Sequence, residues 1–470
     1  MFKRTAIAAF SLVASSLGVT AFAEDNSSAL PRSNIIHNTS DTALSITNVL
    51  DQRLSELERL REIDAENNQK KIDETPVVAA GKDGFLLRAP DTSYQLRIRY
   101  EGHFDGRYFL LSDTFSIQHQ PTFLARRARP IIETRLPGPF FLRLMADFGS
   151  GKVEIPDAYI ESGFDQRIGI RVGKFKSPFS IEVQQSTAAV PFLELSLSSQ
   201  LAPNRDIGVQ LQGDIGNGIL SYAVGAFNGA ADGSSLDGDW NRSKDLSGRV
   251  FIQPFQRSSI LKGLGAGGAF TYGNHYDPRD PKKWSSTIVP VSVSGLKTAG
   301  QESFFKYRDT TYASGNQTRY SLQGSYYVGS LGLLGEYIRS TSLLTQKNIE
   351  KEVTNSGWSI AVTYAITGEL NNFKGLKPIR NFNPTKGQWG ALDIAGRIST
   401  VEIDKSIFPV LADSTKQARR AFDYTGGVNW HLNRNVKILL DYTQTQFTGG
   451  AKTGNAPDEK LLAGRVQIVY

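Results

Sequence analysis

The chain has 470 residues, no cysteine and a formal charge of +7 at pH 7. The lack of cysteine excludes a disulfide framework, a thiolate metal site and a thiol nucleophile. A modest hydrophobic fraction of 40% does not exclude a membrane barrel, because every second residue of a barrel strand is polar.

Residues 1–23 have the pattern of a secretory signal. Lys3 and Arg4 precede an apolar run, and Ala21-Phe22-Ala23 forms a small-x-small cleavage site. The run is shorter than the ~20 residues that a transmembrane helix needs, which disfavours a retained anchor. No later run reaches that length, so a membrane form would have to cross the bilayer as a closed barrel.

The charge is unevenly distributed along the chain. The signal carries two bases, and residues 24–75 contain eleven acids and six bases, which leaves +10 for residues 76–470. In an exported chain this surplus favours small anions over nucleic acid as partners.

Residues 24–75 differ in composition from the rest of the chain. Leu50, Leu54 and Leu57 are separated by charged residues and predict a helix with a narrow apolar seam. Two alternatives remain open for this leader: a solvated helix or flexible periplasmic segment, and a short coiled coil that trimerises the chain below a barrel. Either form could contact the periplasm or the cell wall.

The stretch 94–108 reads YQLRIRYEGHFDGRY. Its even positions are apolar, aromatic or glycine, and its odd positions are polar or charged. This period of two predicts a β-strand. A typical soluble strand has about five or six residues. A strand of this length and pattern is more typical of a transmembrane barrel wall, which has lipid on one side and water on the other.

Sixteen such segments follow one another, and bacterial barrels require an even number. They are 94–108, 122–136, 140–148, 153–164, 166–173, 206–214, 218–227, 245–252, 264–273, 317–328, 331–340, 357–365, 388–401, 420–431, 434–447 and 460–470. Tight turns alternate with long connections, of which the longest are 174–205, 228–244, 274–316, 341–356 and 402–419. The connection 366–387 is long although it falls on the short-turn side. The fold class predicted is therefore all-β: a 16-stranded antiparallel transmembrane β-barrel over 76–470, ending on Tyr470 and preceded by a short helical segment.

No catalytic motif fits this pattern. Gly263-x-Gly265-x-x-Gly268 is followed by an alternating strand rather than the helix that a dinucleotide site needs. The five histidines are far apart, which predicts scattered surface histidines rather than a metal site. There is no G-x-S-x-G elbow. We expect no enzyme activity and no cofactor, with a Ser/His pair across barrel strands as the open alternative.

Arginine is frequent on the predicted lumen face. Guanidinium groups are always charged and bind oxyanions bidentately, so clustered lumen arginines favour anions. The alternative is that they pair with Glu101, Asp105, Glu133, Asp147 and Glu161 and only keep the wall wet and rigid. The arginines concerned are Arg97, Arg99, Arg107, Arg127, Arg129, Arg135, Arg143, Arg167, Arg171 and Arg319.

Five short motifs, in order, carry a family resemblance. They are Leu124-Ala125-Arg126-Arg127-Ala128, Asp157-Ala158-Tyr159, Val172-Gly173-Lys174-Phe175-Lys176 running into Phe179, Thr367-Gly368-Glu369 and Gly426-Gly427-Val428-Asn429-Trp430. From about Gly84 to Tyr470 the chain resembles the outer-membrane phosphate- and pyrophosphate-selective porin O/P family. The resemblance implies homotrimers of sixteen-stranded barrels that are narrowed by inward loops, here 174–205, 274–316 and 366–387.

The resemblance carries some functional residues over and not others. It places the family's arginine pair at Arg126 and Arg127 and its channel aspartate at Asp157. The family's loop lysine and arginine fall near Val183 and Leu195, and its loop arginine ladder falls at Val289 and Val291. Pure alternation turns only one of the adjacent arginines toward the lumen, and a β-bulge would turn both.

The sequence thus predicts an outer-membrane porin for passive diffusion of small anions, phosphate-like anions among them. Lys174 and Lys176 at the root of loop 174–205 extend the positive path, and Lys374, Lys377 and Arg380 stand at the periplasmic mouth. The alternatives are a weakly selective general or carbohydrate porin and an envelope-tethering barrel. The loop aromatics Phe192, Trp284, Phe304 and Phe305 lack the regularity of a sugar-stacking ladder, which favours a packing role.

Overall fold

The structure is a computed structural model that describes residues 36–81, 83–110, 121–239, 243–275 and 293–470. It has two compact units, one ending at Ile72 and one beginning at Asp73. The described part of the first unit, residues 36–72, belongs to the helix α1 (Ile36–Glu74). It contains the predicted seam, with Leu50, Leu54 and Leu57 each more than half exposed. Among the described residues, no helix is both long and apolar enough to cross a membrane.

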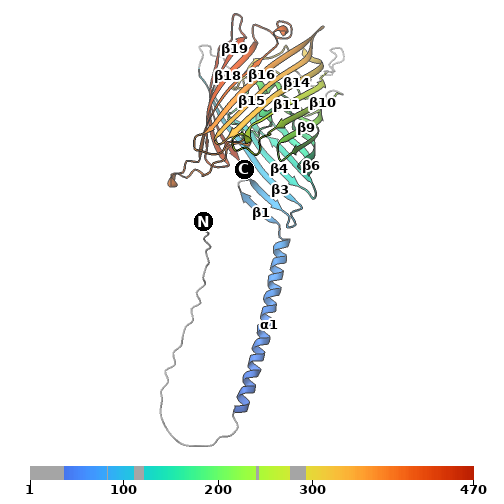
Figure 1. The fold of residues 1–470 in the computed structure, drawn as a ribbon. Helices are drawn as coiled ribbons and strands as arrows, with labels where there is room; N and C mark the ends of the chain where they lie inside the picture. Colours follow the sequence, from blue (N-terminus) through green and yellow to red (C-terminus); the bar gives the residue numbers. More distant parts are fainter. Residues whose placement is uncertain (1–35, 82, 111–120, 240–242, 276–292) are drawn as a thin grey trace, which may run out of the picture. The chain divides into compact units, whose positions relative to one another are not determined.

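The second unit is a closed antiparallel barrel of sixteen strands, as predicted (Figure 1). Each strand pairs with its neighbour, and the last pairs with the first through Gly464 opposite Gly106. The strands are β3 (Gln95–Phe109), β4 (Thr122–Arg135), β5 (Phe140–Asp147), β6 (Glu154–Asp165), β7 (Ile168–Lys176), β8 (Arg205–Ile215), β9 (Leu220–Phe227), β10 (Asp245–Ile252), β11 (Gly265–Asn274), β14 (Thr311–Val328), β15 (Leu331–Gln346), β16 (Ile349–Ala365), β17 (Ala391–Glu402), β18 (Ala418–His431), β19 (Val436–Gly449) and β20 (Glu459–Val469).

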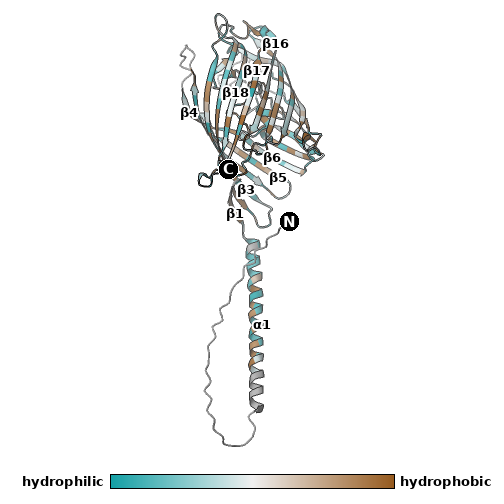
Figure 2. Ribbon diagram, turned by 60° about the vertical axis from the view of Figure 1, so that its left-hand side comes forward, coloured by the Kyte–Doolittle hydropathy of each residue, from teal (hydrophilic) through white to brown (hydrophobic). Residues whose placement is uncertain are grey.

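The two faces of β3 follow the predicted alternation. Glu101, His103 and Asp105 are at most 5% exposed and face the interior, whereas Phe104 and Tyr108 are about half exposed on the outer surface. Hydrophobic and hydrophilic residues alternate along the strands in the same way elsewhere in the barrel (Figure 2). The period of two therefore separates a lipid-facing surface from a polar interior.

One predicted loop is wrong. Residues 341–356 are not a long connection, because β15 and β16 continue through them to a two-residue hairpin at Lys347 and Asn348. Lys347 has a positive φ of 56°, as tight hairpin turns require. Both faces of this extension carry many polar residues, so it lacks the alternation that marked the other strands.

Four strands lie outside the sixteen. The hairpin β1 (Val77–Gly81) and β2 (Gly84–Arg88) pairs with the first residues of β3, beyond the point where β20 ends. Two short strands, β12 (Leu296–Lys297) and β13 (Ser303–Phe305), form a separate ribbon within the connection between β11 and β14.

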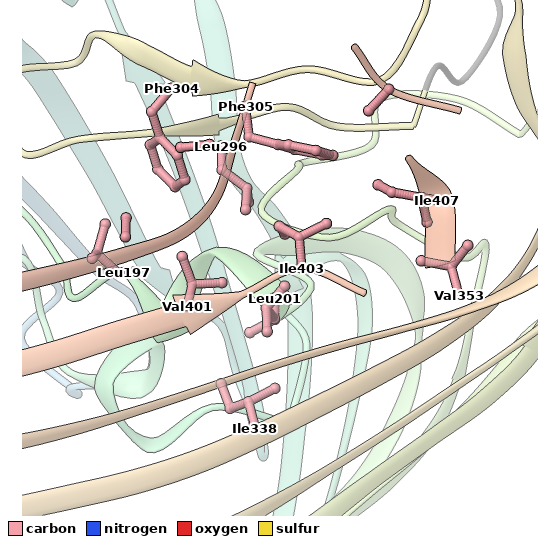
Figure 3. Packing of buried hydrophobic residues seen from close by; sticks show 14 of the residues in the cluster. Leu197, Leu201, Leu296, Phe304, Phe305, Ile338, Val353, Val401, Ile403 and Ile407 are labelled. Atoms are coloured by element: carbon pink, nitrogen blue, oxygen red, sulfur yellow. The ribbon is translucent and has the colours of Figure 1, made fainter. Parts of the chain in front are cut away.

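An apolar cluster, here called the apolar plug, fills part of the barrel interior (Figure 3). It joins inward residues of the wall, such as Ile338 and Val401, to side chains of three connections that fold inward. The connections contribute Leu197 and Leu201, Phe304 and Phe305, and Ile403 and Ile407, all at most 8% exposed. Phe192 packs in a neighbouring buried cluster. The predicted packing role of Phe192, Phe304 and Phe305 is confirmed, and Trp284 lies outside the described residues.

Candidate functional site: the constriction of the lumen

The connection between β7 and β8, residues 177–204, crosses the lumen and is here called the constriction loop. Its backbone forms hydrogen bonds with strands on the opposite side of the barrel. The amide of Leu193 donates to Asp441 on β19 at 2.7 Å, and the amide of Leu197 donates to Ser399 on β17 at 3.1 Å. The path through the barrel is therefore narrowed by a loop fixed at both sides.

A buried glutamate of the wall fixes the beginning of the loop. Ser180 caps the short helix α2 (Ile181–Gln184) by accepting from the amide of Val183. Its hydroxyl donates to Glu336 on β15 at 2.6 Å, and the amide of Ile181 donates to the other oxygen of that carboxylate at 3.1 Å. A carboxylate with several donors is well satisfied, so this contact holds the loop rigidly.

Many of the predicted lumen arginines are paired with carboxylates. A chain of alternating charges runs across β3, β4, β5, β6 and β8. It links Arg99 to Glu133 (3.3 Å), Glu133 to Arg143 (2.5 Å), Arg143 to Asp157 (3.2 Å) and Asp157 to Arg205 (2.9 Å). The three arginines neutralise the two wall carboxylates and leave a surplus of one positive charge.

Arg129 is paired in the same way at the constriction. Its guanidinium contacts Asp147 at 2.6 Å and Glu101 at 3.3 Å, and it donates to Thr187 of the constriction loop at 3.2 Å. Two carboxylates therefore surround one guanidinium.

A β-bulge in β4 turns both adjacent arginines inward. His103 of β3 pairs with Arg127, but Phe104 pairs with Ala125, so Arg126 is the extra residue. Gly149 packs against the bulge, where a Cβ would lie 2.6 Å from the carbonyl oxygen of Arg126. The bulge resolves the conflict between two neighbouring arginines and strict alternation.

Arg126 contacts the constriction loop. Its Nε lies 2.8 Å from Glu194, which also lies 2.7 Å from Arg107. Asp105 accepts two hydrogen bonds from the guanidinium group of Arg465, at 2.6 and 2.8 Å. It also lies 3.3 Å from Arg107. Three guanidinium groups and two carboxylates thus meet at one side of the constriction.

A few cations at the constriction have no carboxylate partner within the described part of the chain. Arg127 contacts only a ring nitrogen of His103, at 3.1 Å. Lys176 donates to the carbonyl of Gln185 at 2.5 Å, and Lys437 donates to two backbone carbonyls of the constriction loop. Carbonyl oxygens orient an ammonium group without forming an ion pair, so these three residues are constriction cations with no ion-pair partner among the described residues.

The other predicted cations lie elsewhere. Arg97 is half-buried on β3, and Arg135 is exposed at the end of β4 near the ring of Phe141. Lys174 pairs with the exposed Asp237. Lys374, Lys377 and Arg380 are exposed on the connection between β16 and β17. Arg167 and Arg171 pair with Asp165 and Glu161, and Arg319 is fully buried against Asp232.

The predicted surface histidines are wrong for three of the five positions. His103 is fully buried beside Arg127, His275 is buried at 2.9 Å from Asp245, and His431 is buried at 2.6 Å from Asp393. Their burial could have been predicted, because each histidine lies at an inward position of an alternating strand or next to the end of one.

The two loop positions that match cationic residues of the resembled family are apolar and packed. Val183 belongs to the apolar plug and is 4% exposed, and Leu195 packs against the plug. Val289 and Val291 lie outside the described residues.

The connection between β16 and β17, residues 366–390, also contacts the constriction loop. Gln185 donates to the carbonyl of Phe373 at 3.1 Å. Between the two segments is a pocket of about 590 Å³, part of it open to solvent, whose lining includes Asn371, His431 and Lys437. The predicted inward folding of this connection is consistent with these contacts.

Three charged residues of the constriction were not predicted from the sequence. Arg465 on β20 and Lys437 on β19 occupy inward positions that alternation indicates. Glu194 lies in the loop, where no periodicity fixes the direction of a side chain.

The closed barrel, its polar interior and the inserted loop define the chain as an outer-membrane porin. The family model described as phosphate-selective porin O and P matches residues 103–470. The chain belongs to this family.

Solved structures of outer-membrane barrels are similar in fold. The outer membrane channel DcaP of Acinetobacter baumannii matches with a TM-score of 0.52 and 10% identity, over 83% of this chain and 99% of that chain. In-vitro folded OmpT of Vibrio cholerae matches with a TM-score of 0.49 and 10% identity, over 80% and 98%. The anion-selective porin from Comamonas acidovorans matches with a TM-score of 0.47 and 11% identity, over 80% and 100%. No curated protein matches the sequence.

Proposed function

We propose that this porin allows passive diffusion of small anions, and that cations of the constriction create the preference. The observation that carries the proposal is the set Arg127, Lys176 and Lys437, none of which forms an ion pair with a described carboxylate. Unpaired positive charge in a narrow, low-dielectric passage raises the local concentration of anions. Most of the other predicted lumen arginines form ion pairs with carboxylates and thereby stabilise the barrel wall.

The mechanism is electrostatic and involves no covalent step. The constriction loop sets the diameter, and the surplus cations lower the barrier for an anion that enters it. The family and the fold point to a channel rather than an enzyme.

A weakly selective porin is the second candidate. It is favoured over a phosphate-specific channel because Val183 and Leu195 are packed in or against the apolar plug and offer no donor to an oxyanion. Binding of a dehydrated phosphate needs charged, bidentate donors.

Reversal potentials in a salt gradient across a planar bilayer test both candidates. We expect chloride to permeate better than potassium, and we expect micromolar phosphate to leave the chloride current unchanged. A cation preference would refute the anion proposal. Block by micromolar phosphate would refute the weakly selective alternative.

We further propose that residues 1–23 are removed on export and that residues 24–75 assist assembly of a homotrimer. The exposed apolar seam of α1, which includes Leu50, Leu54 and Leu57, supports a helix–helix contact between copies. OmpT of Vibrio cholerae has a structure described as a trimer form.

Deleting residues 24–75 should leave single-channel conductance unchanged, because the barrel residues are retained. The deletion should lower the detergent resistance of the trimer, measured as the trimer fraction on heating in semi-native gels. A substitution of Arg59, a charged residue of α1, by lysine is the control. An unchanged trimer fraction after the deletion would assign the leader to a contact outside the porin.

A further inference from the structure

Glu194 is the only loop carboxylate, among the described residues of the constriction loop, that contacts two wall arginines. Its Oε1 lies 2.7 Å from Nη2 of Arg107 and 2.8 Å from Nε of Arg126. Its Oε2 lies 3.2 Å from Nη2 of Arg126, and Nη2 of Arg465 is 4.0 Å from Oε1. The contact with Arg126 is the two-pronged geometry by which guanidinium groups bind free oxyanions.

The contact is strong and deeply placed. The side chain of Glu194 is 10% exposed and that of Arg107 is 4% exposed. Burial alone would raise the pKa of Glu194, but Arg126, Arg107 and Arg465 outweigh it and hold that pKa well below its ordinary value. The guanidinium groups therefore favour the ionised form of this carboxylate.

Two of the three arginines, Arg107 and Arg465, are held in place by groups other than Glu194. Asp105 binds Arg465 bidentately, and Arg107 also donates to the carbonyl of Gly300 at 3.2 Å. Asp105 neutralises one of the three positive charges and Glu194 a second. If Glu194 lost its charge, the positions of Arg107 and Arg465 would persist and the surplus charge at this point would double.

We propose that Arg107, Arg126 and Arg465 form an oxyanion-binding site in the constriction, and that Glu194 occupies it as a tethered competitor. The residue thereby determines specificity: it makes a site suited to carboxylates and phosphates unavailable and leaves the channel weakly selective. This inference rests on the proposed anion diffusion through the lumen.

The test compares the wild-type channel with Glu194→Gln in planar bilayers. Glutamine has nearly the same shape, and its amide oxygen still accepts from the arginines, so folding should be retained. One charge about 5 Å from a permeating ion in water changes its local concentration by about fourfold. Chloride becomes about fourfold more concentrated and potassium about fourfold less, so we expect the chloride-to-potassium permeability ratio to rise by about sixteenfold. We also expect inorganic phosphate to reduce the chloride current at a lower concentration than in the wild type.

The control is Glu402→Gln. Glu402 also pairs with an arginine, Arg419, but it is about half exposed at the end of β17. The same loss of charge there should change the permeability ratio much less. A rise equal to that of Glu194→Gln would show that total charge, and not this site, sets selectivity.

The double variant Arg126→Gln with Glu194→Gln tests whether the additional phosphate block needs the guanidinium group of Arg126. It should lose the additional phosphate block of the single variant. If Glu194→Gln gives no change in ratio and no additional block while its heat-modifiable gel mobility shows a folded barrel, the inference is overturned. If it does not fold, Glu194→Asp serves instead: the shorter side chain should bind Arg126 less closely and admit partial phosphate block, and its absence refutes the proposal. The sign of the wild-type preference tests the proposed function separately, because the comparison between variants does not depend on it.

Discussion

Replacing Arg127 by glutamine should lower the anion-to-cation permeability ratio by about sixteenfold, because one unit charge about 5 Å away in water changes the local concentrations of anion and cation by about fourfold each, in opposite directions. Arg127 contacts His103 and, in the described structure, no carboxylate. Replacing the guanidinium group therefore removes one positive charge from the constriction and leaves no carboxylate without its ion-pair partner. Reversal potentials in a potassium chloride gradient measure the change.

Arg434→Gln is the matched control for this prediction. Arg434 is exposed in the turn between β18 and β19. Its replacement removes the same charge from the molecule and should leave the ratio nearly constant. Equal ratios for the wild type and Arg127→Gln would show that Arg127 only supports the wall.

Replacing Phe305 by alanine should destabilise the apolar plug by about 3–5 kcal/mol, the usual cost of removing a buried phenylalanine. Phe305 is fully buried and packs edge-to-face on Tyr307 with ring centroids 4.8 Å apart. The backbone bonds of the sixteen-stranded wall do not involve this side chain. The loss should therefore loosen the inward connections and not unfold the barrel.

Two measurements separate these effects. Limited proteolysis should cut the connection between β11 and β14 faster in the variant, and single-channel records should show more current noise. Phe255→Ala, at a partly exposed position between β10 and β11, should change neither. Loss of the heat-modifiable barrel band in Phe305→Ala would contradict a role confined to the plug.

The barrel could be predicted from the sequence because lipid and water impose opposite demands on adjacent residues of a strand. The prediction fails where apolar and polar residues stop alternating. At the paired ends of β15 and β16, polar residues such as Thr341, Thr345 and Glu350 interrupt the pattern. Their pairing is visible only in the register of the hairpin.

The charged residues of the wall were predictable, but their partners were not. Alternation placed Arg99, Arg107 and Arg129 inside, and the suggested pairing with wall carboxylates is what the structure shows for all three. Glu194 could not be anticipated, because its direction depends on a loop whose path is fixed by distant residues such as Asp441.

The bulge at Arg126 also bears on how the strand tolerates changes in length. In a regular strand, loss of one residue turns every side chain beyond it to the opposite face. In β4 the pairing already passes over Arg126, from Arg127 to Ala125. Deletion of Arg126 alone would restore an unbroken ladder and leave every remaining side chain of β4 on its present face. This position is therefore one where a barrel strand can gain or lose a residue, and with it one charge, in a single genetic step.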